Sequence, residues 1–144
     1  MKNNKFFDSV HPKDLLSTLW IFFLFCIFFS DFQWIVTPGS LEEISSGFIR
    51  GNEMTQDLLF IASVVHVIPV LMVLLSRVMK RTINRWLNIS MGTFTLLLTF
   101  SSGWDNPDQI FFKVVEVIGL LLIVWYAWKW PKQGEQYDDG HLDL

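Results

Sequence analysis

The stretch from Asp57 to Arg85, DLLFIASVVHVIPVLMVLLSRVMKRTINR, constrains the fold of this chain most strongly. It opens with an acidic residue, continues without charge for about twenty residues, and ends among basic residues. A helix of about twenty residues rises about 30 Å, which matches the hydrocarbon core of a lipid bilayer. We therefore predict a membrane-spanning helix over residues 56–79, followed by a basic hinge at residues 80–85.

Three more apolar runs predict further spanning helices over about residues 15–36, 86–104 and 109–130. Hydrophobic residues make up 51% of the 144 residues, and four apolar runs are too many for the single core of a small soluble domain. The short hinge makes the second and third spans antiparallel neighbours. The predicted fold class is all-α: one integral membrane domain, an antiparallel four-helix bundle, with a polar, disordered tail over 131–144.

The connection between the first two spans is predicted to contain a short helix at the membrane surface. Thr37-Pro38-Gly39 ends the first span, and LEEISSGF follows. Ser40 and Glu43 have the spacing of a capping box, in which the first side chain caps the helix and the second reaches back to it.

The basic residues predict the orientation of the chain in the membrane. Nine of the eleven lysines and arginines fall on one side of the predicted topology: Lys2, Lys5, Lys13, Arg77, Lys80, Arg81, Arg85, Lys129 and Lys132. Because basic residues concentrate on the cytoplasmic side, both termini are expected in the cytoplasm, with the protein in the cell (inner) membrane. Arg77, Lys80, Arg81 and Arg85 also form a candidate site for anionic lipid headgroups, although a topology signal alone would explain them.

Three ionisable residues lie within the predicted spans: Asp31, His66 and Glu116. Such residues are costly in lipid and normally face other helices or water. Counting helical rises places them about 8, 15 and 10 Å from the outer ends of their helices, respectively. We therefore hypothesise that they line one ligand-binding pocket that opens to the outer side.

Each of the three also has a simpler explanation. Asp31 would lie at the headgroup level if the first helix ended early. Glu116 would pair with Lys113, three residues earlier on the same helix. His66 would donate a hydrogen bond to a carbonyl or to a threonine of the third span, and Pro69 frees a carbonyl nearby.

No catalytic motif is recognisable, so no catalytic residue is predicted and an enzymatic role is not favoured. The single cysteine, Cys26, excludes an intrachain disulfide and a cysteine-based metal site, and no metal ligand is predicted. A single histidine in the membrane excludes a bis-histidine haem within one chain. Nothing indicates nucleic-acid binding, so the expected partners are the lipid bilayer and either further copies of the chain or a larger membrane complex.

The order of features resembles an uncharacterised bacterial family of four-span membrane proteins, known as a domain of unknown function. The matching stretches are PGSLEEI, IPVLMVLLSRV, NRWLNI and VWYAWKW. More distantly the architecture is similar to DoxX-like proteins, small four-helix membrane proteins of which some are tied to quinone-linked redox chemistry. That resemblance implies a quinone as a possible cofactor, although no cofactor is predicted from the residues themselves.

Three functions are therefore expected, in this order. The first is a multi-pass membrane protein that binds a small or lipid-like ligand through Asp31, His66 and Glu116. The second, ranked nearly equal, is a structural or accessory subunit of a membrane complex. The third, a DoxX-like quinone-linked redox subunit, ranks last because no cysteine or histidine constellation supports it.

Overall fold

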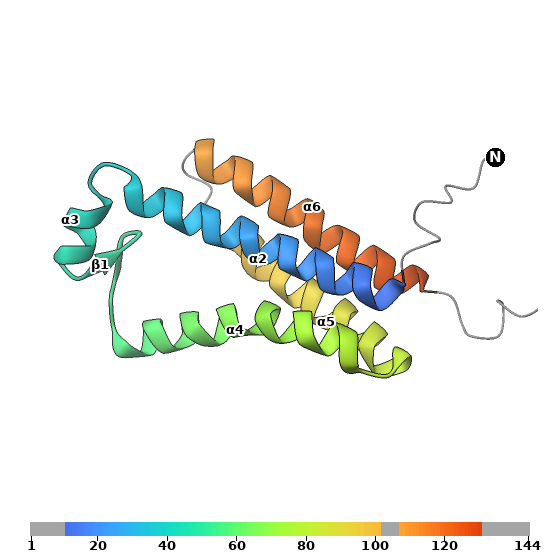
Figure 1. Cartoon of the computed structure of the whole chain (residues 1–144). Coiled ribbons are helices and arrows are strands. Elements are labelled where there is room, and N and C mark those ends of the chain that lie inside the picture. Colours follow the sequence, from blue (N-terminus) through green and yellow to red (C-terminus); the bar gives the residue numbers. More distant parts are fainter. Residues whose placement is uncertain (1–10, 102–106, 131–144) are drawn as a thin grey trace, which may run out of the picture.

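The computed structural model describes residues 11–101 and 107–130, and this part of the chain is almost entirely helical (Figure 1). Along the chain the elements are α2 (Pro12–Val36), α3 (Ser40–Ser45), β1 (Phe48–Ile49), β2 (Asn52–Glu53), α4 (Gln56–Val78), α5 (Arg81–Ser101) and α6 (Pro107–Lys129). The fold is therefore all-α with one small hairpin. The predicted tail at 131–144, together with Lys2 and Lys5, lies outside the described residues.

The ends of the long helices follow from local sequence. Pro12 begins α2, where its missing N–H costs nothing, and the His11 ring accepts a hydrogen bond from the Lys13 N–H (3.3 Å). Thr55 caps α4, since its hydroxyl accepts from the Leu58 N–H (3.2 Å). Pro69 lies inside α4, which continues through it to Val78.

Helix α5 begins at Arg81, five residues before the predicted start at 86. Met79 and Lys80 alone separate it from α4, and the Asn84 N–H already donates to the Lys80 carbonyl (2.9 Å). The residues interpreted as a hinge therefore form the first turns of a helix. Except for Lys80, which lies in the connection, their side chains project from a helix and do not belong to a loop.

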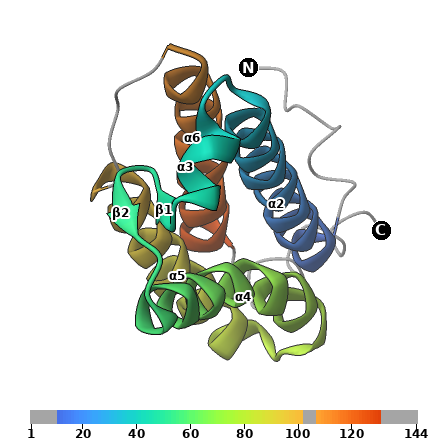
Figure 2. The ribbon, with the colours of Figure 1, turned by 90° about the vertical axis from the view of Figure 1, so that its left-hand side faces the viewer.

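The four long helices lie side by side, with α3 and the hairpin in front of them at one end (Figure 2). Helix α2 packs against α4 and α6, and α5 packs against α6, whereas the packing between α4 and α5 is much sparser. We call the end with α3 and the hairpin the hairpin end. The opposite end, where α4 passes into α5 and where α2 begins and α6 finishes, is the basic end (Figure 1).

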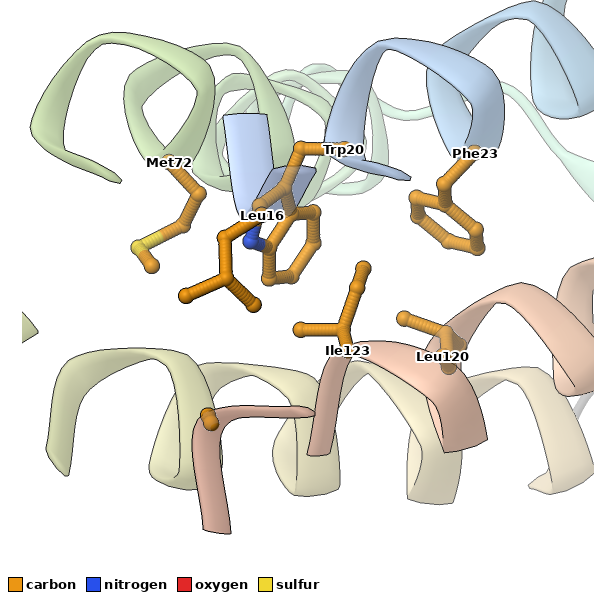
Figure 3. Close-up of a cluster of buried hydrophobic side chains, with 7 residues drawn as sticks. Leu16, Trp20, Phe23, Met72, Leu120 and Ile123 are labelled. Atoms are coloured by element: carbon orange, nitrogen blue, oxygen red, sulfur yellow. The ribbon is translucent and has the colours of Figure 1, made fainter. Parts of the chain in front are cut away.

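The apolar core lies between α2, α4 and α6, toward the basic end (Figure 3). Its buried side chains are Leu16, Trp20, Phe23, Met72, Leu120, Ile123 and Ala127. Gly92 brings α5 close to α6, because a Cβ at this position would lie 2.9 Å from a methyl carbon of Val124. A larger residue there would push the two helices apart.

The connection after α2 differs from the predicted surface helix. Helix α3 ends at Ser45, and Gly47 (φ +87°) turns the chain into a hairpin that pairs Phe48 with Glu53. The predicted capping box is not formed. Gly39 is the N-cap in place of Ser40 and makes no side-chain hydrogen bond, and the Glu43 carboxylate accepts a hydrogen bond from the Gly51 N–H. Glu43 therefore binds the hairpin turn instead of its own helix.

Within residues 11–101 and 107–130, three helices are long and apolar enough to cross a membrane: α2, α4 and residues Gln109–Lys129 of α6. Each also exposes many large apolar side chains, such as Phe28, Phe60 and Phe111. These properties are consistent with membrane association.

Candidate functional site

The hairpin turn positions the first charged side chain of the candidate site. Arg50 and Gly51 both have positive φ, +49° and +75°, which is the geometry of a tight primed turn. A left-handed conformation is unfavourable for arginine and persists where neighbouring groups enforce it. Glu43 holds the Gly51 N–H, and the Asn52 side chain donates to the Arg50 carbonyl (3.1 Å). The turn therefore fixes Arg50 above the end of α2.

Arg50 and His66 meet at Asp31, and the three residues come from three different elements. A terminal guanidinium nitrogen of Arg50 donates to Asp31 Oδ1 at 3.0 Å, and the Arg50 guanidinium also lies over the Trp34 ring, 5.2 Å from its centre. His66 Nε2 lies 3.5 Å from Asp31 Oδ2. The hairpin, α2 and α4 are thus joined through one carboxylate.

Both nitrogens of the His66 ring face hydrogen-bond acceptors. Nδ1 lies 2.7 Å from the Ala62 carbonyl oxygen, and Nε2 faces the Asp31 carboxylate. A carbonyl accepts only, and so does an ionised carboxylate, so the doubly protonated imidazolium satisfies both contacts. A neutral ring would leave one nitrogen facing an acceptor without a proton to offer.

Glu116 and Lys113 are both buried on α6. Glu116 interacts electrostatically with Asp31, Lys113 and Arg50, and its charge also reaches Cys26 on α2. Glu116 and Lys113 therefore extend the charged group between α2 and α6. We call Asp31, Arg50, His66, Lys113 and Glu116 together the charged cluster.

The three predicted site residues are thus placed differently. Asp31 and His66 lie together, 3.5 Å apart at their nearest polar atoms, whereas Glu116 interacts through longer-range electrostatics. Arg50 was not among the predicted site residues. The hydrogen bond of His66 goes to its own helix and not to the third span.

A second polar group, also missed, lies in the core toward the basic end. Asn88 of α5 accepts hydrogen bonds from Trp20 Nε1 (2.7 Å) and from the Ser76 hydroxyl (3.2 Å), and its amide donates to Asn84 Oδ1 (2.6 Å). All four side chains are buried. This polar group could have been inferred from the sequence, because Asn84 and Asn88 lie one turn apart on a helix whose other face is apolar.

The four residues predicted to bind lipid headgroups have separate environments. Arg77 is exposed, and its Nε donates to the Ser17 hydroxyl of α2 (3.1 Å). Lys80 is exposed between α4 and α5. Arg81 donates to the Trp130 carbonyl (3.0 Å), and the Arg85 guanidinium lies over the Trp128 ring.

The charged cluster can bind polar groups, but its residues do not indicate a metal centre. In residues 11–101 and 107–130, no three or more His, Cys, Asp and Glu side chains are grouped so that they could hold a metal ion. The five side chains are Arg50, Lys113, His66 and two carboxylates, so three of the five can donate hydrogen bonds to acceptor oxygens.

Fold and site together define an all-α protein with three helices able to cross a membrane and a charged cluster at one end of them. The chain belongs to the family of unknown function DUF6326, whose sequence model matches residues 4–136. No curated protein and no solved structure matches the chain significantly. The family assignment therefore supplies no activity, and function has to be argued from the site.

Proposed function

We propose that this chain is a multi-pass membrane protein that binds a small amphiphilic ligand at the hairpin end. The observation that carries the proposal is the Asp31–Arg50–His66 contact, which joins three elements around one carboxylate. Polar residues at this depth in a membrane helix are costly and commonly mark a ligand or ion site. Here they lie where α4 is least covered, since the buried residues of α4, Pro69, Met72 and Ser76, all lie toward the basic end.

In this proposal α5 is a fourth spanning helix, which makes the domain an antiparallel four-helix bundle. Its mean hydropathy is low because its polar residues face inward: the buried positions are Asn84, Asn88, Gly92 and Thr95. The opposite face exposes large apolar side chains such as Phe94, Leu97 and Phe100. A helix that is polar toward its neighbours and apolar outward suits lipid, because lipid solvates only the apolar face.

The orientation follows from the distribution of basic residues. Lys13, Arg77, Lys80, Arg81, Arg85 and Lys129 lie at the basic end of the described chain. We place this end in the cytoplasm of a cell with the protein in its inner membrane, which puts both termini on the cytoplasmic side. The charged cluster then lies near the outer side, accessible to a ligand from the outer leaflet or from outside the cell.

The chemistry of the cluster narrows the ligand to amphiphiles whose polar group carries acceptor oxygens. Arg50 donates a hydrogen bond to Asp31, and the His66 and Lys113 side chains can donate further hydrogen bonds. A carboxylate or a carbonyl pair would fit these donors, and the apolar part of the ligand would lie against the exposed face of α4. A quinone is one such molecule, and fatty acids and lysolipids are others.

The test compares the molecules that co-purify with wild-type protein and with the double variant His66→Ala, Glu116→Gln. Solvent extracts of both proteins are analysed by mass spectrometry, and their thermal stability is recorded in the same detergent. The proposal expects an amphiphile with acceptor oxygens in the wild type and at least a tenfold loss in the variant. Asp57→Asn is the matched control, because Asp57 is an exposed acid of α4 outside the cluster. Equal ligand content and equal stability in wild type and double variant would contradict the proposal.

A second candidate function is an accessory subunit of a membrane complex, or a subunit of a homo-oligomer. The observation in its favour is α4, which contacts α5 sparsely and exposes Phe60, Leu71 and Leu74 among other large apolar residues. Such a face could receive a transmembrane helix of a partner. Chemical cross-linking in membranes followed by mass spectrometry distinguishes the two, because an accessory subunit gives a defined partner and no co-purified ligand.

A further inference from the structure

The basic end of the molecule carries a strong excess of positive charge. Six basic residues lie there in the described chain: Lys13, Arg77, Lys80, Arg81, Arg85 and Lys129. Among the described residues the acidic group at this end is Asp14, in the first turn of α2. Most of these positive charges therefore lack a carboxylate partner within residues 11–101 and 107–130.

Exposed tryptophans mark the depth of this end in a membrane. Trp86 on α5 and both Trp125 and Trp128 on α6 are exposed, at 60%, 46% and 61%. Tryptophan rings prefer the layer of lipid headgroups, where the ring is partly apolar and the N–H reaches water. The ends of α5 and α6 therefore lie at the headgroup level in the proposed membrane arrangement.

Two cations are held against these rings at the same level. The Arg85 guanidinium lies 5.9 Å from the centre of the Trp128 ring, and the Lys129 ammonium lies 4.4 Å from the centre of the Trp125 ring. Arg81 is fixed nearby through its bond to the Trp130 carbonyl. The side chains of this group are thus positioned by α6 before any ligand binds.

Arg81 and Arg85 each have one hydrogen-bond donor without a partner among the described residues. The Nε atom of each is buried from solvent and has no hydrogen-bond partner within the described residues. Both side chains nevertheless remain partly exposed, so other nitrogens of the guanidinium groups can reach outward. The outward nitrogens of two neighbouring guanidinium groups are well suited to a phosphate, which accepts several N–H bonds at once.

We propose that Arg81 and Arg85, assisted by Lys129, bind the phosphodiester headgroup of an anionic phospholipid between the basic ends of α5 and α6. The exposed Trp128 ring would pack against the lipid below its phosphate. This site lies at the opposite end of the molecule from the charged cluster. It rests on the proposed membrane arrangement but not on the ligand proposed for the hairpin end. Of the four residues expected from the sequence, the site takes the two that contact the end of α6, whereas Arg77 contacts Ser17 of α2 and Lys80 lies between α4 and α5.

The acidic segment that follows Trp130 in the sequence is an alternative anion for these arginines. The segment after Trp130 contains Glu135, Asp138, Asp139 and Asp143. The lipid is favoured because the tryptophan rings place the guanidinium groups at the headgroup level. The experiment treats the acidic segment as an alternative occupant.

Full-length protein in a non-ionic detergent is incubated with equal amounts of phosphatidylglycerol and phosphatidylcholine, and bound lipids are counted by native mass spectrometry. Wild type is expected to retain phosphatidylglycerol in preference. Arg81→Gln with Arg85→Gln is expected to lower that retention at least about tenfold, because each basic residue contributes about fivefold near an anionic headgroup. The control Lys13→Gln with Lys80→Gln removes the same charge from the same end. It should lower the retention clearly less than the arginine double variant does, because the contacts to Trp128 and Trp130 belong to the arginines.

Several results would overturn this site. Equal losses in the two double variants would show general attraction to a basic surface, and no loss in either would show that the arginines do not bind lipid. Displacement of phosphatidylglycerol by inorganic phosphate would identify a free anion as the ligand. Binding that appears only when Glu135, Asp138 and Asp139 are neutralised would show that the chain itself occupies the arginines. If the Gln variant fails to fold, Arg81→Lys with Arg85→Lys decides the question, because it keeps the charge and removes the forked donors: retained preference contradicts the site and lost preference supports it.

Discussion

The hydrogen bond between Trp20 of α2 and Asn88 of α5 should contribute measurably to the free energy of unfolding. Asn88→Ala removes the acceptor of the Trp20 Nε1–H, which is buried and bonded at 2.7 Å. A buried donor without a partner costs about 1–3 kcal/mol. The Ser76 hydroxyl, the second donor to Asn88, can turn to a carbonyl of its own helix and recover part of its bond. We therefore expect Asn88→Ala to lower the free energy of unfolding by about 1.5–3 kcal/mol.

A double-mutant cycle isolates the bond from the loss of packing. Trp20→Phe is made alone and together with Asn88→Ala, and the non-additive part of the two effects is the coupling energy. Hydrogen bonds between membrane helices average about 0.6 kcal/mol and reach about 1.7 kcal/mol, so the coupling should fall in this range.

The assay is reversible unfolding in mixed micelles by a denaturing detergent, followed by far-ultraviolet circular dichroism. The cycle of Asn88→Ala with Ser63→Ala serves as control, because Ser63 is an exposed residue of α4 that bonds its own helix. Its coupling should be within about 0.3 kcal/mol of zero. A Trp20–Asn88 coupling as small as that of the control would refute the reasoning.

Three further predictions concern single positions, and each is measured by thermal or detergent-induced unfolding. Gly92→Ala should destabilise by about 1–2 kcal/mol, because its Cβ would lie 2.9 Å from Val124 and overpacking outweighs the gain in helix propensity. Gly119→Ala meets Phe22 at 3.4 Å and should be neutral or stabilising by up to about 1 kcal/mol; equal behaviour of the two variants would show that the α5–α6 contact does not depend on Gly92. Ser17→Ala should lower the free energy of unfolding by about 1–2 kcal/mol, because it removes the hydrogen bond to the Val73 carbonyl and the acceptor of Arg77 Nε. The control Thr18→Ala, on the exposed face, should lower it by less than about 0.5 kcal/mol. Asp31→Asn should cost less than about 1 kcal/mol, since the Asp31 and Arg50 side chains are 44% and 40% exposed; a loss above about 2 kcal/mol would mean that this pair supports the fold more than it supports a ligand.

The long helices were predictable because the signal for them is local. A run of apolar residues with few charges specifies a helix of a given length, and α2, α4 and α6 lie over the predicted ranges at 15–36, 56–79 and 109–130. The start of α5 was not found, because its first turns carry Arg81, Asn84 and Arg85 and resemble a loop by composition. Tertiary bonds to Trp130 and Ser76 stabilise these turns, and hydropathy does not report such bonds.

The hairpin was not predicted, for a different reason. Its strands have two residues each, too short for an alternating pattern to be visible, and Arg50-Gly51 is not one of the residue pairs that usually indicate a primed turn. As a result, no local pattern predicts that Arg50 contacts Asp31, nineteen positions earlier in the chain. The residue types of the candidate site were predictable in part, but its contacts depend on a turn that only the folded chain reveals.

The inward polar face of α5 has a consequence for how this protein is made. Alone in a bilayer, α5 would expose Asn84 and Asn88 to lipid, which makes independent insertion of this segment unfavourable. Their hydrogen-bond partners Ser76 and Trp20 lie earlier in the chain and are synthesised first. In the proposed membrane arrangement, α5 should therefore leave the insertion machinery together with α4 and against an already inserted α2. Loss of Asn88 would then make the third segment easier to insert while making the finished protein easier to unfold.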